Sequence, residues 1–322
     1  MNLSLLICLL VTASACQQLP VPQGAKADSH PYDPGAEQRN SAGADEVYGP
    51  PTKLADLEDP AIKESSGIVA SRTTPGLYWT HNDSGDGPFI YAFDNRGARR
   101  GTWRVTGATA RDWEDIAAGP GPTRGTSYLY IGDIGDNEGR RSEIIVYRIP
   151  EPTVEAANAK SNKAKPQLTA AAEAIRLRYL DGKHDSEALL VHPVTGNIYV
   201  LTKIPFANPT IYEAVAPYSA TGTTTLVRIG ELNVPSLFGG MITGGDISPD
   251  GRRVALCDYV QGYEIVLPHA SSAFNRIWKQ PLKSIGLGER KQGEAIGYRL
   301  DGKALLATSE GRPAPLLQVV RR

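Results

Sequence analysis

The stretch Glu187-Ala188-Leu189-Leu190-Val191, followed by the return strand Asn197-Ile198-Tyr199-Val200-Leu201, decides the fold. An acidic residue opens a short apolar strand, a Gly-containing turn follows, and a second apolar strand runs back, which is the pattern of a β-hairpin. Four further stretches follow the same plan, and their acidic residues are Glu64, Glu114, Asp246 and Glu294. Self-similarity of this kind indicates a repeat architecture.

The spacing of these acidic residues gives the length of the repeat. Successive intervals are 50, 73, 59 and 48 residues, and the long one contains a 22-residue insertion, 151–172, rich in Ala, Lys and Pro. A third apolar strand follows each hairpin, and a fourth follows in four units, over residues 101–105, 174–179, 224–229 and 276–282. A period of about 50 residues with four strands is typical of a β-propeller blade. We expect the insertion to be a mobile surface excursion outside the core.

The two ends of the repeat region predict how the ring closes. The fifth unit stops after three strands, because the chain ends at Arg322. Residues 52–57, Thr-Lys-Leu-Ala-Asp-Leu, precede the first unit and alternate polar with apolar side chains. If this strand pairs beside residues 315–320, no open edge is left in the ring. The sequence therefore predicts an all-β, five-bladed β-propeller over residues 52–322, closed by an N-terminal strand, with a six-bladed ring as the alternative.

The composition excludes several classes of protein. The formal net charge is −1 with 21% charged residues, so the chain has no basic field for nucleic acid, and we expect no nucleic-acid partner. Hydrophobic residues make up 41%, which suffices for a core, and three cysteines cannot form a disulfide scaffold. Cys257 lies in an apolar strand and is expected to be a buried, inert thiol. We expect a monomer.

The N-terminal segment is predicted to be an export signal. Its apolar run over residues 3–11 is too short to span a bilayer, and Ala13-Ser14-Ala15-Cys16 resembles a bacterial lipobox. Residues 1–15 are therefore predicted to be a signal peptide, and Cys16 is the expected lipidation site. An ordinary secretory signal is the alternative, because no Lys or Arg precedes the apolar run. Residues 16–51 are expected to be a disordered tether, and the lipid anchor is the expected membrane attachment, at the outer membrane or cell surface.

Acidic residues are predicted to gather at one mouth of the central channel. In a propeller, the start of each inner strand and the end of the second strand lie on the same face, so we expect a ring of Glu64, Glu114, Glu187, Asp246 and Glu294. Strand ends add Asp83, Asp133, Lys203, Asp258 and Glu310 to this face. Two carboxylates about 5 Å apart repel by roughly 3 kcal/mol at an effective dielectric of about 20, so the ring requires a cation or shared protons.

The chemistry of this ring leaves two interpretations open. Oxygen donors in this number suit Ca²⁺ best and Mg²⁺ or Mn²⁺ next. Alternatively, each acid is a structural latch that accepts backbone N–H groups from the next blade.

Candidate catalytic residues lie near the same face. They are His81, Asp83, Arg111 and Lys203. Lys203 stands where other units carry an acid, and a cation beside a metal suits an anionic substrate. His81 is a candidate general base. The sequence holds no G-x-S-x-G, H-E-x-x-H or C-x-x-C motif, which sets aside the enzymes that depend on them.

Several motifs carry a resemblance to a known group of proteins. They are Glu64-Ser65-Ser66-Gly67, Asp112-Trp113-Glu114-Asp115-Ile116-Ala117, Ile131-Gly132-Asp133-Ile134-Gly135-Asp136-Asn137 and Tyr147-Arg148-Ile149-Pro150-Glu151-Pro152. Over residues 60–320 the chain resembles secreted bacterial β-propellers loosely called phytase-like or esterase-like. It is more weakly similar to calcium-activated nucleotidases, five-bladed propellers with calcium in a channel ringed by acidic and Ser side chains. That likeness implies a ring of Glu64, Ser65, Glu114, Glu187, Asp246 and Glu294.

Two functions follow as expectations. The first is an exported, lipid-anchored, calcium-dependent hydrolase of phosphate esters or a similar small anionic substrate. The second is a non-catalytic propeller that binds a protein partner and holds a structural calcium. A carboxylate ring open to solvent favours the hydrolase, and a channel plugged by apolar side chains favours the binding module.

Overall fold

The computed structural model describes residues 47–219, 221–236, 239–270 and 272–322. The predicted signal peptide, the lipidation site Cys16 and most of the predicted tether lie outside the described residues. Within the described part, strands predominate, and two short 3-10 helices occur, η1 (Ala156–Lys160) and η2 (Phe274–Lys279). No helix in this part is long and apolar enough to cross a membrane.

The strands form five antiparallel units of four strands each. The first unit contains β2 (Ser65–Ala70), β3 (Leu77–Asn82), β4 (Phe89–Asp94) and β5 (Arg99–Arg104). The second contains β6 (Trp113–Pro120), β7 (Ser127–Asp133), β8 (Ile144–Pro150) and β10 (Glu173–Tyr179). The third contains β11 (Ser186–Val191), β12 (Ile198–Thr202), β14 (Thr210–Ala214) and β15 (Thr223–Glu231).

The last two units complete the set. The fourth contains β17 (Gly244–Ile247), β18 (Arg253–Cys257), β19 (Gly262–Val266) and β20 (Lys283–Ile285). The fifth contains β21 (Gly293–Tyr298), β22 (Ala304–Ser309), β23 (Pro315–Val320) and β1 (Thr52–Asp56). Residues 276–282, expected as the fourth strand of the fourth unit, instead fall largely in η2. Phe274, Ile277 and Trp278 recur there at helical spacing, and Ile277 and Trp278 are buried.

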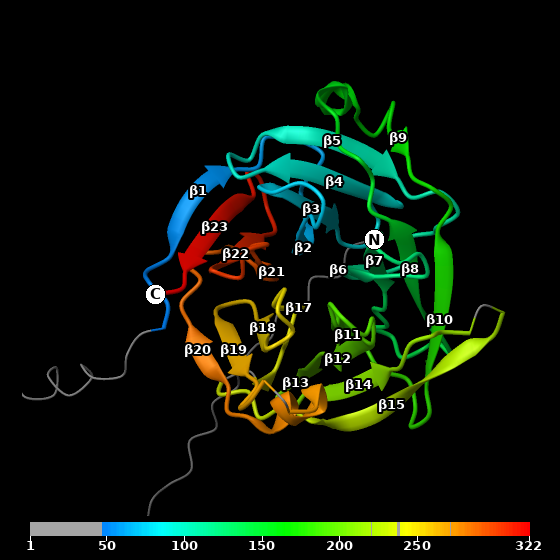
Figure 1. Ribbon diagram of the computed structural model, residues 1–322, viewed down its shortest axis with the longest axis vertical. Helices are drawn as coiled ribbons and strands as arrows, with labels where there is room; N and C mark the ends of the chain where they lie inside the picture. Colours follow the sequence, from blue (N-terminus) through cyan, green and yellow to red (C-terminus); the bar gives the residue numbers. More distant parts are fainter. Residues whose placement is uncertain (1–46, 220, 237–238, 271) are drawn as a thin grey trace, which may run out of the picture. The chain divides into compact units, whose positions relative to one another are not determined.

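The units are arranged around a central axis (Figure 1). Inner strands β2, β6, β11, β17 and β21 contact one another in that order, and β21 contacts β2, which makes the ring continuous. The predicted all-β propeller fold is therefore confirmed. One irregularity joins the second and third units, because the outer strands β10 and β15 pair in parallel. A further pair of short strands, β13 (Ile204–Pro205) and β16 (Gly239–Gly240), lies outside the five units.

The N-terminal strand closes the ring, as predicted. β1 pairs antiparallel with β23, and Asp56 stands opposite Pro315. The pairing extends further back than the sequence indicated. Tyr48 forms a β-bridge with Arg321, and the Gly49 N–H donates to the Val320 carbonyl at 2.8 Å. Residues 47–49, which the sequence analysis assigned to the predicted tether, are therefore paired with the last strand.

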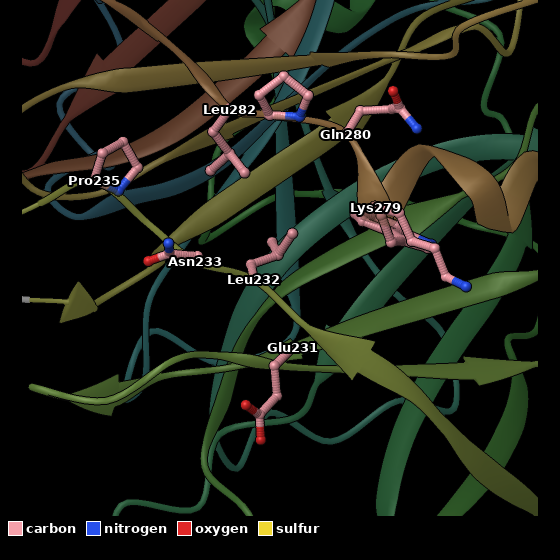
Figure 2. A pocket seen from close by; sticks show the side chains of 9 residues that line it. Glu231, Leu232, Asn233, Pro235, Lys279, Gln280 and Leu282 are labelled. Carbon is pink, nitrogen blue, oxygen red and sulfur yellow. The ribbon is translucent and has the colours of Figure 1, made fainter.

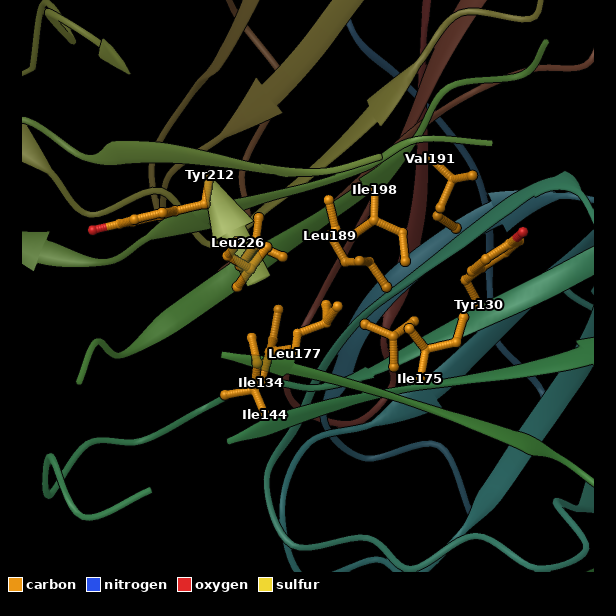
Figure 3. Packing of buried hydrophobic residues seen from close by; sticks show 14 of the residues in the cluster. Tyr130, Ile134, Ile144, Ile175, Leu177, Leu189, Val191, Ile198, Tyr212 and Leu226 are labelled. Carbon is orange, nitrogen blue, oxygen red and sulfur yellow. The ribbon is translucent and has the colours of Figure 1, made fainter. Parts of the chain in front are cut away.

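The hydrophobic core lies between neighbouring units. Figure 3 shows the cluster between the second and third units, in which Tyr130 and Ile175 approach Leu189, Val191 and Ile198. Alternating side chains of each strand face the units on either side, as the strand patterns require. Cys257 is fully buried in another such cluster, and burial raises the pKa of its thiol to about 11, which agrees with the inert thiol expected.

The insertion 151–172 lies along the outer edge of the first unit and does not form the free excursion that we expected. Its short strand β9 (Gln167–Leu168) pairs in parallel with β5. The Ser161 hydroxyl accepts the Thr102 N–H at 2.8 Å, and the Ala172 N–H donates to the Thr106 carbonyl at 2.8 Å. The polar composition suggested mobility, but these bonds satisfy the exposed edge of β5.

Candidate metal centre

Three of the predicted acidic residues occupy the same structural position. Glu114, Glu187 and Glu294 each stand at a register shift in an inner strand, where one extra residue is inserted opposite the second strand. A β-bulge of this kind re-aims side chains and is common next to functional sites. The first unit carries Ser66 at the corresponding shift. The repeat therefore delivers three buried glutamates and one serine to the channel mouth.

Two groups of three carboxylates meet at Asp83. One consists of Asp83, Glu294 and Glu310, and the other of Asp83, Asp112 and Glu114; within each group the ligand oxygens lie within 4.8 Å of one another. Asp83 follows β3 in the first unit, and its partners come from the fifth unit on one side and the second on the other. The five carboxylates are called the Asp83 cluster below. A cation at Asp83 is thus within reach of three adjacent blades.

A glycine allows the loop after β7 to lie against this cluster. A Cβ placed on Gly135 would stand 2.1 Å from Glu114 Oε1 and 2.4 Å from Asp112 Oδ2. The Ile134 N–H also donates to the Asp112 carbonyl at 3.1 Å, which fixes this loop over the start of β6. A side chain at position 135 would therefore require the two carboxylates to move. The acidic turn after β7, part of the motif Ile131 to Asn137, therefore lies directly against the cluster.

Burial raises the proton affinity of the cluster. The pKa of Glu114 lies well above its usual value because the side chain is buried, and the charges of Glu187 and Asp83 add to the rise. Burial and the Asp83 charge raise the pKa of Asp112 to about 6. Burial raises the pKa of Glu294 as well, against the opposing hydrogen bond from Gln292 at 2.9 Å. The cluster therefore holds protons near neutral pH in the absence of a cation.

Lys203 forms an ion pair with Glu187, the bulge glutamate of the third unit. Its ammonium contacts the Glu187 carboxylate directly, and it lies 5.4 Å from the centre of the Tyr259 ring. Burial disfavours the charge on Lys203, but the Glu187 carboxylate more than offsets this and raises the pKa of Lys203. Both side chains are largely buried, so the pair is held as an ion pair in a poorly solvated position.

The structure brings only two of the five acids of the predicted ring, Glu114 and Glu294, into the Asp83 cluster. Glu64 is exposed and lies two residues before the bulge, in register with Asp112 rather than Glu114. Asp246 is buried, but β17 pairs with β18 without a bulge. Asp246 therefore does not occupy the position of the bulge glutamates. Among the described residues, neither Glu64, Glu187 nor Asp246 belongs to a group of three carboxylates within ligand distance. Acidic residues that match in the sequence repeat do not match in the structure, because three inner strands contain a bulge and β17 does not.

Two other buried acids are latches, which supports the alternative interpretation for them. Asp246 Oδ2 accepts the Tyr298 N–H at 2.8 Å and so joins β17 to β21. Asp115 Oδ2 accepts the N–H groups of Leu189 at 3.0 Å and Gly245 at 3.2 Å, which ties β6 to β11 and β17. These carboxylates take the place of missing backbone contacts where inner strands converge.

Of the four candidate catalytic residues, two lie in or next to the Asp83 cluster and two do not take part in it. Asp83 lies in the cluster, and Lys203 is coupled to it through Glu187. His81 is fully buried, and burial lowers the pKa of its imidazole. Its Nδ1 lies 2.8 Å from the Asn82 carbonyl oxygen, and its Nε2 has no hydrogen-bond partner in the described part of the chain. Arg111 is exposed, and only its backbone N–H has a described hydrogen bond, to Asp133 at 3.2 Å. His81 therefore has no access to a substrate as a general base.

Two other strand-end acids are used within their own units. Asp133 forms a buried ion pair with Arg141 at 2.7 Å. Asp258 accepts the Tyr263 hydroxyl at 2.6 Å. Asp112 and Asp185 were not among the predicted site residues, although each stands two residues before a bulge glutamate, in Asp112-Trp113-Glu114 and Asp185-Ser186-Glu187. This repeated acid-x-Glu spacing is the signal that identifies Asp112.

The residues of the Asp83 cluster fit a hard divalent cation. All of its donors are carboxylate oxygens, which is the ligand chemistry of Ca²⁺, Mg²⁺ and Mn²⁺. The cluster contains no thiol or imidazole, the donors that structural zinc sites use.

A further pocket lies apart from the cluster. It has a volume of about 530 Å³ and lies between the end of β15 and η2, with Glu231, Asn233 and Gln280 among its lining residues (Figure 2). The buried Trp278 also lines it, and its Nε1 has no partner among the described residues. It shares no residue with the two carboxylate groups.

Comparison with known proteins gives similarity at the level of solved structures. No family model and no curated protein matches the chain. Hydrazine synthase of Kuenenia stuttgartiensis is similar over 80% of this chain and 71% of its own, with 12% identity and a TM-score of 0.41. A nidogen/laminin complex covers 76% and 72%, with 14% identity and a TM-score of 0.40. The Dos1 propeller covers 79% and 67%, with 11% identity and a TM-score of 0.35. The propeller assignment itself rests on the strand pairings.

Proposed function

We propose that this chain is a calcium-dependent propeller that binds a small anionic substrate at the channel mouth and hydrolyses it as a phosphate ester. One observation carries the proposal: Asp83 is shared by two groups of three carboxylates drawn from three neighbouring units. Calcium would be held by Asp83, Asp112, Glu114, Glu294 and Glu310. Repulsion within the cluster favours a cation there, because a bound divalent ion removes both the shared protons and the unfavourable charge contacts.

The chemistry of the surroundings supports an anionic substrate. Asp83, Asp112 and Glu310 are only partly buried, so the cluster is reachable from solvent. When bound, a divalent cation would polarise a phosphoryl oxygen and offset the charge of the phosphate. Lys203 holds Glu187 in place and limits the negative charge beside the substrate.

The proposal is tested with purified protein in two steps. Elemental analysis after dialysis should detect calcium bound to the protein. A panel of phosphate mono- and diesters should then be hydrolysed in calcium, and a chelator should abolish the activity. Bound calcium without hydrolysis of any ester would remove the enzymatic half of the proposal and leave the binding half.

A non-catalytic binding module is the second candidate, and the position of His81 favours it. His81 is fully buried, and Arg111 lies outside both groups of carboxylates. A calcium that serves only to join three blades would need neither residue. In that case chelation would lower the melting temperature, and no phosphate ester would be turned over.

The proposed location is the cell envelope. It is supported by the apolar run over residues 3–11 and the lipobox-like sequence ending at Cys16. Mass spectrometry of the mature N-terminus, isolated from a membrane fraction, tests it. A diacylglycerol-modified Cys16 is expected, whereas an unmodified mature N-terminus would indicate simple secretion.

A further inference from the structure

A pocket beside the Asp83 cluster is lined by three cations, two of which have no partner in the described part of the chain. It has a volume of about 660 Å³ and lies between β1 and the loops before β21 and after β22. Its wall includes Lys53, Lys291 and Arg312, together with Glu310 of the cluster. Glu310 thus belongs to both the pocket and the Asp83 cluster.

The lining carries three cations and three carboxylates, the latter being Asp56, Glu289 and Glu310, but only one ion pair forms among them in the described part of the chain. Lys53 is paired with Asp56 at 2.7 Å. Lys291 and Arg312 are exposed, and the described part of the chain offers their side chains no hydrogen bond or ion pair. Glu289 also lines the pocket and is exposed. Glu310 faces the other acids of the cluster, so two cations remain free on a wall that touches the cation site.

The stem of Lys291 lies beside the backbone at Gly311. Gly311 has a φ of 102°, and a Cβ on it would stand 3.3 Å from Cδ of Lys291, so the Lys291 stem lies across the glycine. Pro313 and Pro315 hold the chain after Arg312, and Pro51 forms part of the opposite wall. Stiff walls of this kind reduce the entropy lost when a ligand binds.

We propose that this pocket is an anion subsite that receives a phosphate-type dianion through Lys291 and Arg312, next to the cation held by the Asp83 cluster. The inference rests on the proposed function and names its substrate class. Arg pairs with phosphate oxygens in a bidentate way, and Lys adds a point charge. A ligand that carries a phosphate and a second polar group would then reach from the pocket to Glu310.

The test is calorimetric titration with phenylphosphonate, which is stable to hydrolysis, in calcium and in chelator. The variants are Lys291→Gln/Arg312→Gln, Glu289→Gln and Lys303→Gln. Lys303 is an exposed matched control in the turn between β21 and β22, at the other end of these strands. We expect the double variant to lose about tenfold or more in phosphonate affinity, the Glu289 variant to gain a few-fold, and the control to match the wild type. Benzoate, a monoanion of similar shape, should bind more weakly than phenylphosphonate.

The outcomes separate this inference from the proposed function. Unchanged phosphonate affinity in the double variant, or tighter binding of benzoate than of phosphonate, would overturn the anion subsite. Calcium titration of the same double variant should show undiminished calcium affinity, because neither cation is a ligand. If the wild type binds no calcium, the proposed function fails, yet phosphonate binding in chelator that the double variant loses still supports the subsite. No phosphonate binding under either condition would overturn it.

Discussion

The carboxylate of Asp246 accepts the backbone N–H of Tyr298 at 2.8 Å and joins the inner strands of the fourth and fifth units. Burial raises the pKa of Asp246 to about 6, although this hydrogen bond and the charge of Arg72 oppose the rise. The residue was predicted as a calcium ligand, and its contact instead defines a structural role. A structural role predicts that variants of Asp246 lose stability but keep their response to calcium.

Asp246→Ala should destabilise the fold by about 1–3 kcal/mol, because the buried Tyr298 N–H loses its acceptor. Asp246→Asn keeps an acceptor and should lose less. Calcium should stabilise both variants as much as the wild type, as measured by urea denaturation with calcium and with chelator. A variant that folds but no longer responds to calcium would return Asp246 to the list of ligands.

Lys203→Met should be more harmful than the loss of a surface ion pair, because it leaves the Glu187 carboxylate buried without a partner. The expected loss is about 3 kcal/mol or more in chelator. The double variant Lys203→Met/Glu187→Gln should recover most of it. Denaturation of the two single variants and the double variant gives the coupling energy, and additive losses would show that the pair is not coupled.

Deletion of residues 1–58 should destabilise the whole propeller, whereas deletion of residues 1–46 should not. The first removes β1, which pairs with β23 and completes the fifth unit. A deletion of residues 1–50 should fall between them, because it removes the Tyr48 hydroxyl that donates to Glu264 at 2.5 Å. Equal melting temperatures for the three proteins would contradict closure by the N-terminal strand.

The stability of the calcium-free protein should fall as the pH rises. Burial raises the pKa of Asp112 to about 6, and it raises those of Glu114 and Glu294 further. The folded state thus binds more protons than the unfolded state above about pH 4, where free carboxylates ionise. The contribution of these three groups to stability is therefore fully present below about pH 4 and is lost as the pH rises through 6 and above. The melting temperature in chelator should drop by several degrees between pH 5 and pH 8, and calcium should reduce the drop.

The fold could be predicted from the sequence because its signals are local. Alternating apolar residues mark each strand, Asp-Gly turns mark the hairpins, and the missing last strand has a counterpart before the first unit. The fourth unit departs from the prediction where Phe274, Ile277 and Trp278 bury one side of a helical turn. A run of that length does not distinguish a strand from a short helix by periodicity.

The site could be predicted only in part, because side-chain direction depends on register. A bulge shifts Glu114, Glu187 and Glu294 by one residue relative to the second strand, and β17 has none. A sequence alignment on acidic residues therefore placed Asp246 with the glutamates. Hydrogen-bond partners distant in sequence also decide which acids are free, as the Tyr298 N–H does for Asp246.

The central claim is that the Asp83 cluster binds calcium, and thermal denaturation of Asp83→Asn with calcium and with chelator tests it most directly. Calcium at about 100 times its dissociation constant should stabilise the wild type by roughly 2.7 kcal/mol. Glu58→Gln, which neutralises an exposed carboxylate outside the cluster, should respond like the wild type. Asp83→Asn should lose the response and be at least as stable as the wild type in chelator, because it removes repulsion. A full calcium response in Asp83→Asn, or a wild type indifferent to chelator, would contradict the account.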